Sequence, residues 1–363
     1  MKRICISILL LGGFILPLSA AHIRGGELYY KYEGPGTSAG TSVYTVTLKL
    51  YIDCGQNDPG QLDQEAALTI FSKPLNKKIG NVMIAPRVGE EFIRYDPTSN
   101  PCITNPPLDV CYRLRYYSVK ITLPDTPDGY TIAFQRCCRI EGIKNVQAPS
   151  NDVGATYQCE IPGTNALPDA PKNSSPAFTA RDAVAICAKS IFTFDFSATD
   201  PDKDSLVYHL CEGYIGGGPN NGKSCLSCPV PNPGAPPPYT PLAYQSPYSG
   251  STPLGPSAQL NSATGILSGF APPTLGQYVV TVCVSEYRRG VLINIHRKDI
   301  HIKVSDCSPL KAQLDPDYSF CNDLNVTFKN GQINPTGSVY TWSFGDGTRS
   351  DTSRIPDGTL QHK

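Results

Sequence analysis

The sequence predicts an all-β protein made of tandem antiparallel β-sandwich domains. Several segments alternate apolar and polar residues at a period of two, which is typical of half-buried strands. The 363 residues include 32 Gly and 34 Pro, which favour short strands joined by tight turns. No long stretch places apolar residues at helical spacing. The length suits two or three domains.

Residues 1–21 have the composition of a signal peptide. A positive start at Lys2 and Arg3 precedes an apolar run, and the small residues Ser19–Ala21 provide a cleavage site. The apolar run is short for a membrane-spanning helix, and no later stretch is apolar enough to cross a bilayer. We therefore expect a secreted or cell-surface protein that begins near His22 and has no transmembrane segment.

The 14 cysteines fit this route, because disulfide bonds form in oxidising compartments. Cys5 would leave with the signal peptide, so an odd number remains and at least one cysteine lacks a partner in this chain. The adjacent Cys137 and Cys138 are expected to pair outward with separate strands. Cys225 and Cys228 form a C-x-x-C motif with no second pair nearby, which favours a disulfide-stapled loop over a zinc site.

The segment 22–171 is predicted to form the N-terminal β-domain. In the stretch YTVTLKLY, Val46, Leu48 and Leu50 lie on one face of a strand, and Thr and Lys residues lie on the other. The stretch SVKITL repeats this pattern at 118–123. Turn-forming clusters separate these strands.

The segment 172–306 is predicted to form a second sandwich of Ig-like or cadherin-like type. In IFTFDF, Phe192, Phe194 and Phe196 alternate with polar residues, and the stretches LVYHL, YVVTVCV and DIHIKV supply further strands. Residues 213–256 are rich in Gly, Pro, Ser and Asn, so we expect a long, poorly ordered loop with polyproline-like parts.

The segment 307–363 is predicted to form only part of a third sandwich, because an Ig-like sandwich needs about 100 residues. In the stretch YTWSFGDG, Tyr340, Trp342 and Phe344 share one strand face, so Trp342 is expected in the core. The flanking glycines permit positive φ angles, and the side chain of Asp346 is expected to bond to its own turn.

A set of ordered motifs resembles a known group of proteins. The motifs are HIRGGELYYKY, LKLYIDC, FQRCCRI, NSSPAFTARDAVAIC, ATDPDKDSLVYHLC, NSATGILSGFAPPTLGQYVVTVCVSEYRRGVLI and YTWSFGDG. Together they resemble the amino-terminal region of large secreted PKD-domain proteins of the Bacteroidota, which usually end in a gliding-motility-associated sorting domain. The resemblance implies export, display or release at the cell surface, and an adhesive or structural role without known chemistry. It also implies a partial PKD domain at 307–363.

Asp200, Asp202 and Asp204 alternate in the stretch ATDPDKDSLVYHLC and form a candidate calcium site. The EF-hand pattern fails, because Ser205 stands where the loop needs Gly and Cys211 where it needs a bidentate Glu. Cadherin-like sandwiches bind calcium through similar Asp-x-Asp arrangements at domain edges. The alternative, which we favour, is a solvated turn capped by Asx hydrogen bonds, with Lys203 offsetting part of the charge.

The sequence does not indicate an enzyme. Paired-carboxylate catalysis needs a desolvated cleft, which an exposed turn would not provide. The histidines lie apart from any G-x-S-x-G motif, and His209 and His301 are expected to face outward from alternating strands. Walker, dinucleotide-binding and H-E-x-x-H motifs do not occur. Asn173 begins a glycosylation sequon that we treat as chance.

The 31 basic and 31 acidic residues balance, so nucleic acid is not an expected partner. The expected partner is an extracellular or cell-surface protein or polysaccharide. The tyrosines of ELYYKY, together with Tyr239, Tyr244 and Tyr248, are predicted to be exposed contact residues. The alternative function is the polysaccharide-binding portion of a larger carbohydrate-active enzyme, since PKD-like modules often accompany such enzymes.

Overall fold

The fold is nearly all β, as the sequence predicts. The computed structural model describes residues 23–54, 62–96, 110–179, 185–217, 232–306, 312–314, 325–331, 334, 338–354 and 359–362. Within these ranges the helical structure consists of two short 3₁₀ turns, Ser150–Asp152 and Ala170–Lys172. No helix in the described part of the chain has the length and hydropathy to cross a bilayer.

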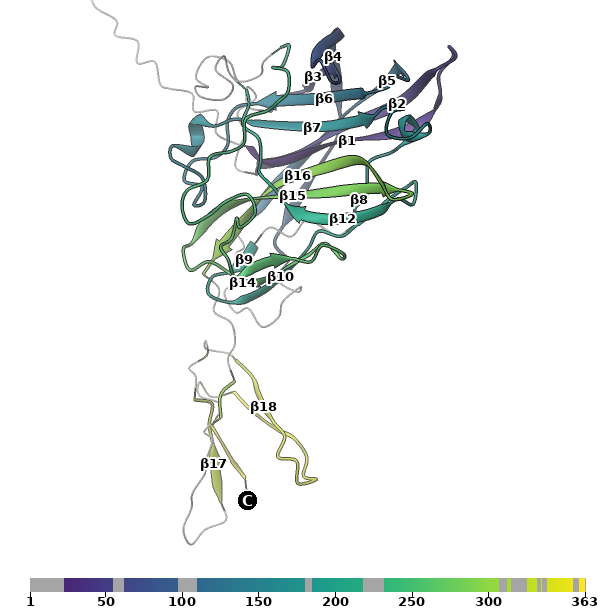
Figure 1. Ribbon diagram of the computed structural model, residues 1–363. Helices are drawn as coiled ribbons and strands as arrows, with labels where there is room; N and C mark the ends of the chain where they lie inside the picture. Colours follow the sequence, from purple (N-terminus) through teal and green to yellow (C-terminus); the bar gives the residue numbers. More distant parts are fainter. Residues whose placement is uncertain are drawn as a thin grey trace, which may run out of the picture.

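One large sheet organises most of the chain. Its hydrogen-bonded order is β12-β15-β16-β1-β2-β5-β4-β3-β6-β7, and β9 adds to β16 in parallel (Figure 1). The strands are β1 (Ile23–Pro35), β2 (Thr41–Asp53), β3 (Glu65–Ser72), β4 (Lys77–Arg94), β5 (Cys111–Pro124), β6 (Gly129–Arg136), β7 (Ala155–Pro162), β9 (Ala185–Cys187), β12 (Ser205–Leu210), β15 (Gly276–Arg288) and β16 (Val291–Ser305). Apart from β9, neighbours pair antiparallel.

Strand β4 folds the sheet back on itself, because its two halves pair with different neighbours. Its first half pairs with β3, and its second half, from Arg87, pairs with β5. The β3-β6-β7 portion therefore faces β1, β2 and β5. A core of buried side chains fills the space between them, drawn from the chain between Ile23 and Ile161. The predicted inward positions Val46, Leu48 and Leu50 all belong to this core.

A second core lies on the opposite face of the same sheet. Leu48 and Leu50 of β2 point into the first core, whereas Tyr51 points into the second, because side chains alternate across a strand. The second core is covered by a separate sheet in the order β10-β14-β13. These strands are β10 (Ile191–Asp195), β14 (Ile266–Phe270) and β13 (Ala258–Leu260). As predicted, Phe192, Phe194 and Phe196 are buried in this core.

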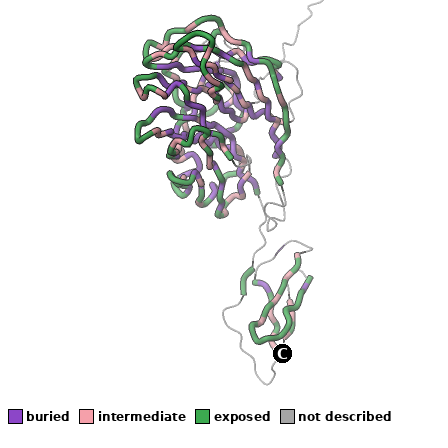
Figure 2. The backbone as a smooth tube through the Cα atoms, turned by 90° about the vertical axis from the view of Figure 1, so that its right-hand side faces the viewer, coloured by how far each residue is buried: buried purple, intermediate pink, exposed green. Residues whose placement is uncertain are grey.

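Strand β15 is buried on both faces, so its sequence lacks the usual alternation. Val280, Val282 and Val284 face the second core, while Val279 joins a smaller cluster with Ile143 and Leu242. In Figure 2 the buried positions run through the interior of the strand-rich body, and the hairpin tips are exposed. A two-sided cover explains why every residue of the stretch YVVTVCV, including Thr281, is buried.

The sheet runs without a break across the predicted boundary between 171 and 172. Strand β1 pairs with β16, and Gly25 lies opposite Ile300. Gly25 has φ +140°, and a Cβ there would lie 2.3 Å from the carbonyl oxygen of Asp299. Only glycine permits this approach of the two backbones. The two predicted segments therefore share one sheet, and both contribute to the second core, the first of them through Tyr51, Tyr112 and Leu114.

The described parts of the Gly/Pro-rich loop are held in place rather than poorly ordered. Within 213–217 and 232–256, the Leu242 N–H donates to the Gly213 carbonyl at 2.7 Å. The Gln147 N–H donates to the Ala243 carbonyl at 3.0 Å, which ties the loop to the segment after β6. The prediction of a poorly ordered loop rested on composition, and composition does not reveal these backbone hydrogen bonds.

The carboxy-terminal strands form two small antiparallel pairs. They are β17 (Val326–Phe328) with β20 (Leu360–His362), and β18 (Tyr340–Trp342) with β19 (Asp351–Ser353). Trp342 is half-buried, and its ring centroid lies 6.0 Å from that of Phe328. The Asp346 carboxylate accepts hydrogen bonds from the Thr348 N–H at 2.9 Å and hydroxyl at 2.6 Å. The predicted turn is confirmed. Strand β18 ends at Trp342, so Phe344 lies beyond it, and Trp342 is half-buried rather than in a core.

Candidate functional site

The three aspartates lie in the turn between β11 (Ala198–Thr199) and β12. Oδ1 of Asp200 accepts the backbone N–H groups of Asp202 and Asp204, each at 2.9 Å. This is the Asx-capped turn that the sequence favours. The candidate ligand atoms of the three residues also lie within 4.8 Å of one another. The calcium site therefore stays a prediction.

Arg288, at the end of β15, offsets the charge of this turn, whereas the sequence pointed to Lys203. Its guanidinium donates to both oxygens of Asp204, at 3.0 Å and 2.6 Å, and lies 3.7 Å from Asp202. Lys203 is exposed. The antiparallel register explains the encounter, because β12 and β15 pair with Ser205 opposite Tyr287. Residues near the end of β15 therefore lie beside the turn.

Glu286 on β15 adds a fourth carboxyl group to this site. Its side chain is 0 % exposed, and Oε2 accepts the side-chain N–H of Asn173 at 3.1 Å. Burial, together with the Asp200 carboxylate, raises the pKa of Glu286 to about 9. Burial also raises the pKa of Asp200. Asn173 itself is fully buried, so its sequon cannot carry a glycan in this fold.

The turn was expected to be exposed and so unsuited to paired-carboxylate catalysis, and this expectation is confirmed for Asp202 and Lys203 but wrong for Asp200. Asp200 is half-buried and lies against the enclosed Glu286. The enclosure itself now argues against such catalysis, because a general acid must lie within hydrogen-bond reach of its substrate. The Glu286 side chain is completely covered by protein.

A second polar cluster surrounds Arg139, which is 0 % exposed. Its guanidinium donates two parallel bonds to the Asp299 carboxylate, at 3.1 Å and 2.7 Å. It also lies 3.3 Å from Nε2 of His301. The prediction that His301 faces outward is wrong, since this side chain is 0 % exposed, whereas His209 is exposed as predicted. His301 lies on the face of β16 that the 139–153 segment covers, and the sequence does not show this cover.

His301 should make the protein less stable in acid. Burial and the neighbouring Arg139 and Arg24 lower the pKa of His301 well below its usual value, so the folded imidazole is neutral. The unfolded chain binds a proton below about pH 6.5, and stability then falls by up to ~1.4 kcal/mol per pH unit. We expect His301→Asn to reduce the difference between urea unfolding free energies at pH 7.5 and pH 5.5. The pKa of His209 is also lowered, by partial burial and Arg297, but less strongly, so His209→Asn is the comparison and should reduce the difference less. An unchanged pH dependence in His301→Asn would contradict the assignment.

Two disulfide bonds link neighbouring strands of the sheet that lie far apart in sequence, β2 with β5 and β12 with β15. Cys54 pairs with Cys111 and Cys211 pairs with Cys283, over sequence separations of 57 and 72. The outward pairing predicted for Cys137 and Cys138 is wrong, because the two bond to each other. The two cysteines lie buried directly after β6, and spacing alone could not decide that they bond to each other. Among the described cysteines Cys159 is free and buried, which agrees with the expected unpaired thiol.

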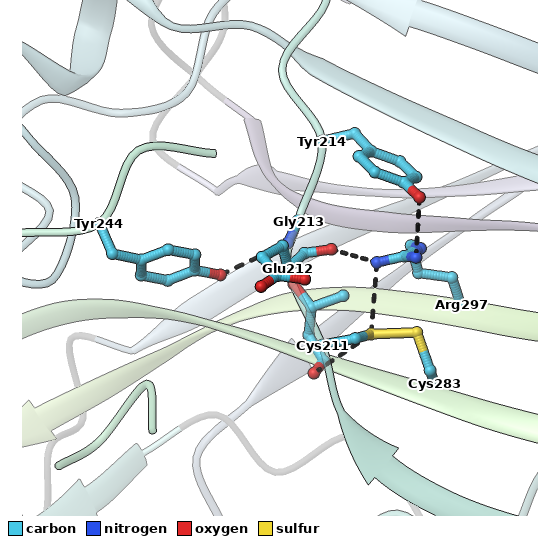
Figure 3. The surroundings of a disulfide bond; sticks show 8 residues. Cys211, Glu212, Gly213, Tyr214, Tyr244, Cys283 and Arg297 are labelled. Atoms are coloured by element: carbon cyan, nitrogen blue, oxygen red, sulfur yellow. Dashed lines mark hydrogen bonds between the residues drawn. A yellow bond between two sulfur atoms is a disulfide. The ribbon is translucent and has the colours of Figure 1, made fainter. Parts of the chain in front are cut away.

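Figure 3 shows how the Cys211–Cys283 bond is packed. Arg297 donates to the sulfur of Cys211 at 3.3 Å and to the hydroxyl of Tyr214 at 3.0 Å. It also donates to the carbonyl of Glu212. These contacts fix the point where the chain leaves β12 and enters the Gly/Pro-rich loop.

The tyrosines predicted as exposed contact residues are instead packed. Tyr30 is 1 % exposed and belongs to the first core, and Tyr29 and Tyr32 are half-buried. The loop tyrosines Tyr239, Tyr244 and Tyr248 are also half-buried. Tyr248 packs against Tyr278, with ring centroids 5.6 Å apart. Large rings in a Gly/Pro-rich loop anchor that loop as readily as they bind a partner.

Two predictions concern residues that the structure does not describe. The signal peptide and the Cys225/Cys228 motif lie outside the described residues. Glu286 and Arg288 were missed by sequence reasoning, although a charged residue two positions after the run YVVTVCV was a usable signal for Glu286. Comparisons with protein-family models, with curated proteins and with solved structures find no match to this chain.

Proposed function

We propose that the chain is an exported, non-enzymatic β-sandwich protein with an adhesion, display or structural role at the cell surface. The observation that carries this proposal is the pair of disulfides Cys54–Cys111 and Cys211–Cys283, which cross-link separate strands. Such bonds persist in oxidising compartments outside the cytoplasm. The residues 1–21 supply a suitable export signal.

The architecture suits a display role. Both faces of the large sheet are covered and the cores are formed by aromatic and branched side chains, so the body is a rigid support. Its partner would be an extracellular protein or polysaccharide. The alternative is a polysaccharide-binding portion of a carbohydrate-active enzyme, whose candidate stacking tyrosines are half-buried apart from the buried Tyr30.

Expression of the whole chain in a bacterium with a periplasm tests export. We expect removal of about 21 residues, seen as a mass shift, and recovery from the periplasm. Thiol titration in denaturant without reductant should find far fewer free thiols than in the reduced sample. A chain that keeps residues 1–21, remains in the cytoplasm and titrates mostly as free thiols would refute the proposal. Retention of the protein on insoluble chitin or cellulose would favour the alternative.

A further inference from the structure

Strand β10 is an edge strand whose outer side is unpaired in the described part of the chain. It pairs with β14 alone, and just after it the Phe196 N–H donates to the Gly265 carbonyl at 2.9 Å. Bonded residues alternate along an antiparallel strand, so the even-numbered residues of β10 bond to β14. The residues whose backbone groups point outward are Ile191, Thr193 and Asp195. No described residue hydrogen-bonds to their N–H or C=O groups.

The same edge carries an exposed apolar surface. Ile191 is 85 % exposed, and Phe270, directly opposite it on β14, is 49 % exposed. In Figure 1, β10 and β14 lie at the lower end of the strand-rich body. Proteins usually protect an edge strand with a bulge, a proline or a charge within the strand. In β10 the pairing shows no bulge, and Asp195 at its end is the only charged residue. Such an edge is a template for pairing with another strand.

The charges at the two ends of β10 are opposite in sign. Asp195 ends the strand and Lys189 lies two residues before its start, and both side chains are exposed. If two copies of the strand align antiparallel, each Lys189 lies near the Asp195 of the other copy. Opposite charges on facing strands stabilise a pair, and an edge that complements itself is what a two-fold interface needs. The edge therefore fits a second copy of this chain.

We propose that β10 pairs antiparallel with β10 of a second copy, which joins the two β10-β14-β13 sheets into one across a two-fold axis. The register that sets Lys189 opposite Asp195 also sets Ile191 opposite Thr193 of the other copy. A shift by two residues would set Ile191 against a carboxylate, so the first register is favoured. The pairing would bond the outward backbone groups and cover Ile191. This inference does not depend on the proposed surface role, because association needs only the folded chain.

Sedimentation equilibrium of the whole purified chain tests the proposal, at concentrations from about 1 µM to about 1 mM, the range of weak interfaces. We expect the average mass to rise toward twice that of one chain. Thr193→Pro removes an outward N–H at an edge position, where proline is tolerated. Ile191→Lys adds a charge at the contact, and each variant should weaken the dimer about 10-fold or more. Val207→Lys, at a residue of β12 that is 41 % exposed, is the matched control and should associate as the unmodified chain does.

Charge reversal tests the register. Lys189→Asp and Asp195→Lys each place like charges at both ends of the pair, so each variant alone should dimerise about 10-fold more weakly. In an equal mixture the two variants should associate with each other as tightly as the unmodified chain does, because opposite charges face each other again. Thermal melts check that each variant is folded. A chain that stays monomeric throughout this range would overturn the proposal. So would association that Thr193→Pro and Ile191→Lys leave unchanged, or a mixture that does not associate.

Discussion

Replacing Arg139 by leucine is expected to lower the free energy of unfolding by about 3–5 kcal/mol. The guanidinium is 0 % exposed and forms two bonds to Asp299, whose side chain is only 4 % exposed. The variant leaves the Asp299 carboxylate buried without its partner, which is the most damaging way to break a buried ion pair. Urea unfolding followed by far-UV circular dichroism measures the loss of unfolding free energy.

Two controls accompany this variant. Lys31→Met removes an ion pair with Glu33 in which the lysine side chain is 68 % exposed, and should leave the urea midpoint nearly unchanged because solvent screens such a pair. The double variant Arg139→Leu/Asp299→Leu removes both charges and should recover much of the loss. A single Arg139→Leu variant as stable as the unmodified chain would show that the buried pair does not form.

Removing the Cys211–Cys283 bond by the double variant Cys211→Ala/Cys283→Ala is expected to lower the free energy of unfolding by about 4 kcal/mol. The bond spans 72 residues, and the chain-entropy model relates the gain to the length of the closed loop. Both cysteines are buried, so alanine avoids placing a polar group in the interior. Urea unfolding without reductant measures the difference.

The adjacent pair Cys137 and Cys138 provides the matched control for this experiment. Both residues are buried and bonded, but their sequence separation is 1, so their bond closes no long loop. The corresponding double alanine variant should therefore show a smaller loss, arising from packing alone. An equal loss in the two double variants would rule out loop entropy as the cause of the Cys211–Cys283 effect.

Local patterns predicted the strands well, because alternation reports which face of a strand is buried. Val46, Leu48 and Leu50 entered one core and Phe192, Phe194 and Phe196 entered the other, as predicted. The pattern could not reveal that both cores share a sheet. That depends on the pairing of β1 with β16, which lie far apart in sequence.

The candidate site was predicted only in its local part. The turn of Asp200 follows from aspartate chemistry within five residues. Glu286, Arg288 and Asn173 reach the turn through strand register and the packing of a distant segment, which no spacing encodes. The same limit applies to His301. Its side chain was predicted to face solvent, but the segment around Arg139 covers it.

The pairing of β1 with β16 also determines how the body would respond to tension. Ile23 begins β1 and Ser305 ends β16, and the strands run antiparallel, with Gly25 opposite Ile300. Ile23 and Ser305 lie at the same end of this strand pair. A pulling force between them therefore loads the hydrogen bonds between β1 and β16 one after another instead of all at once. Tyr51 and Tyr112 pack in the second core with Val280 and Ile300, so the separation of β1 from β16 would also break that core. The buried second core therefore resists the sequential opening that the antiparallel pairing alone would allow.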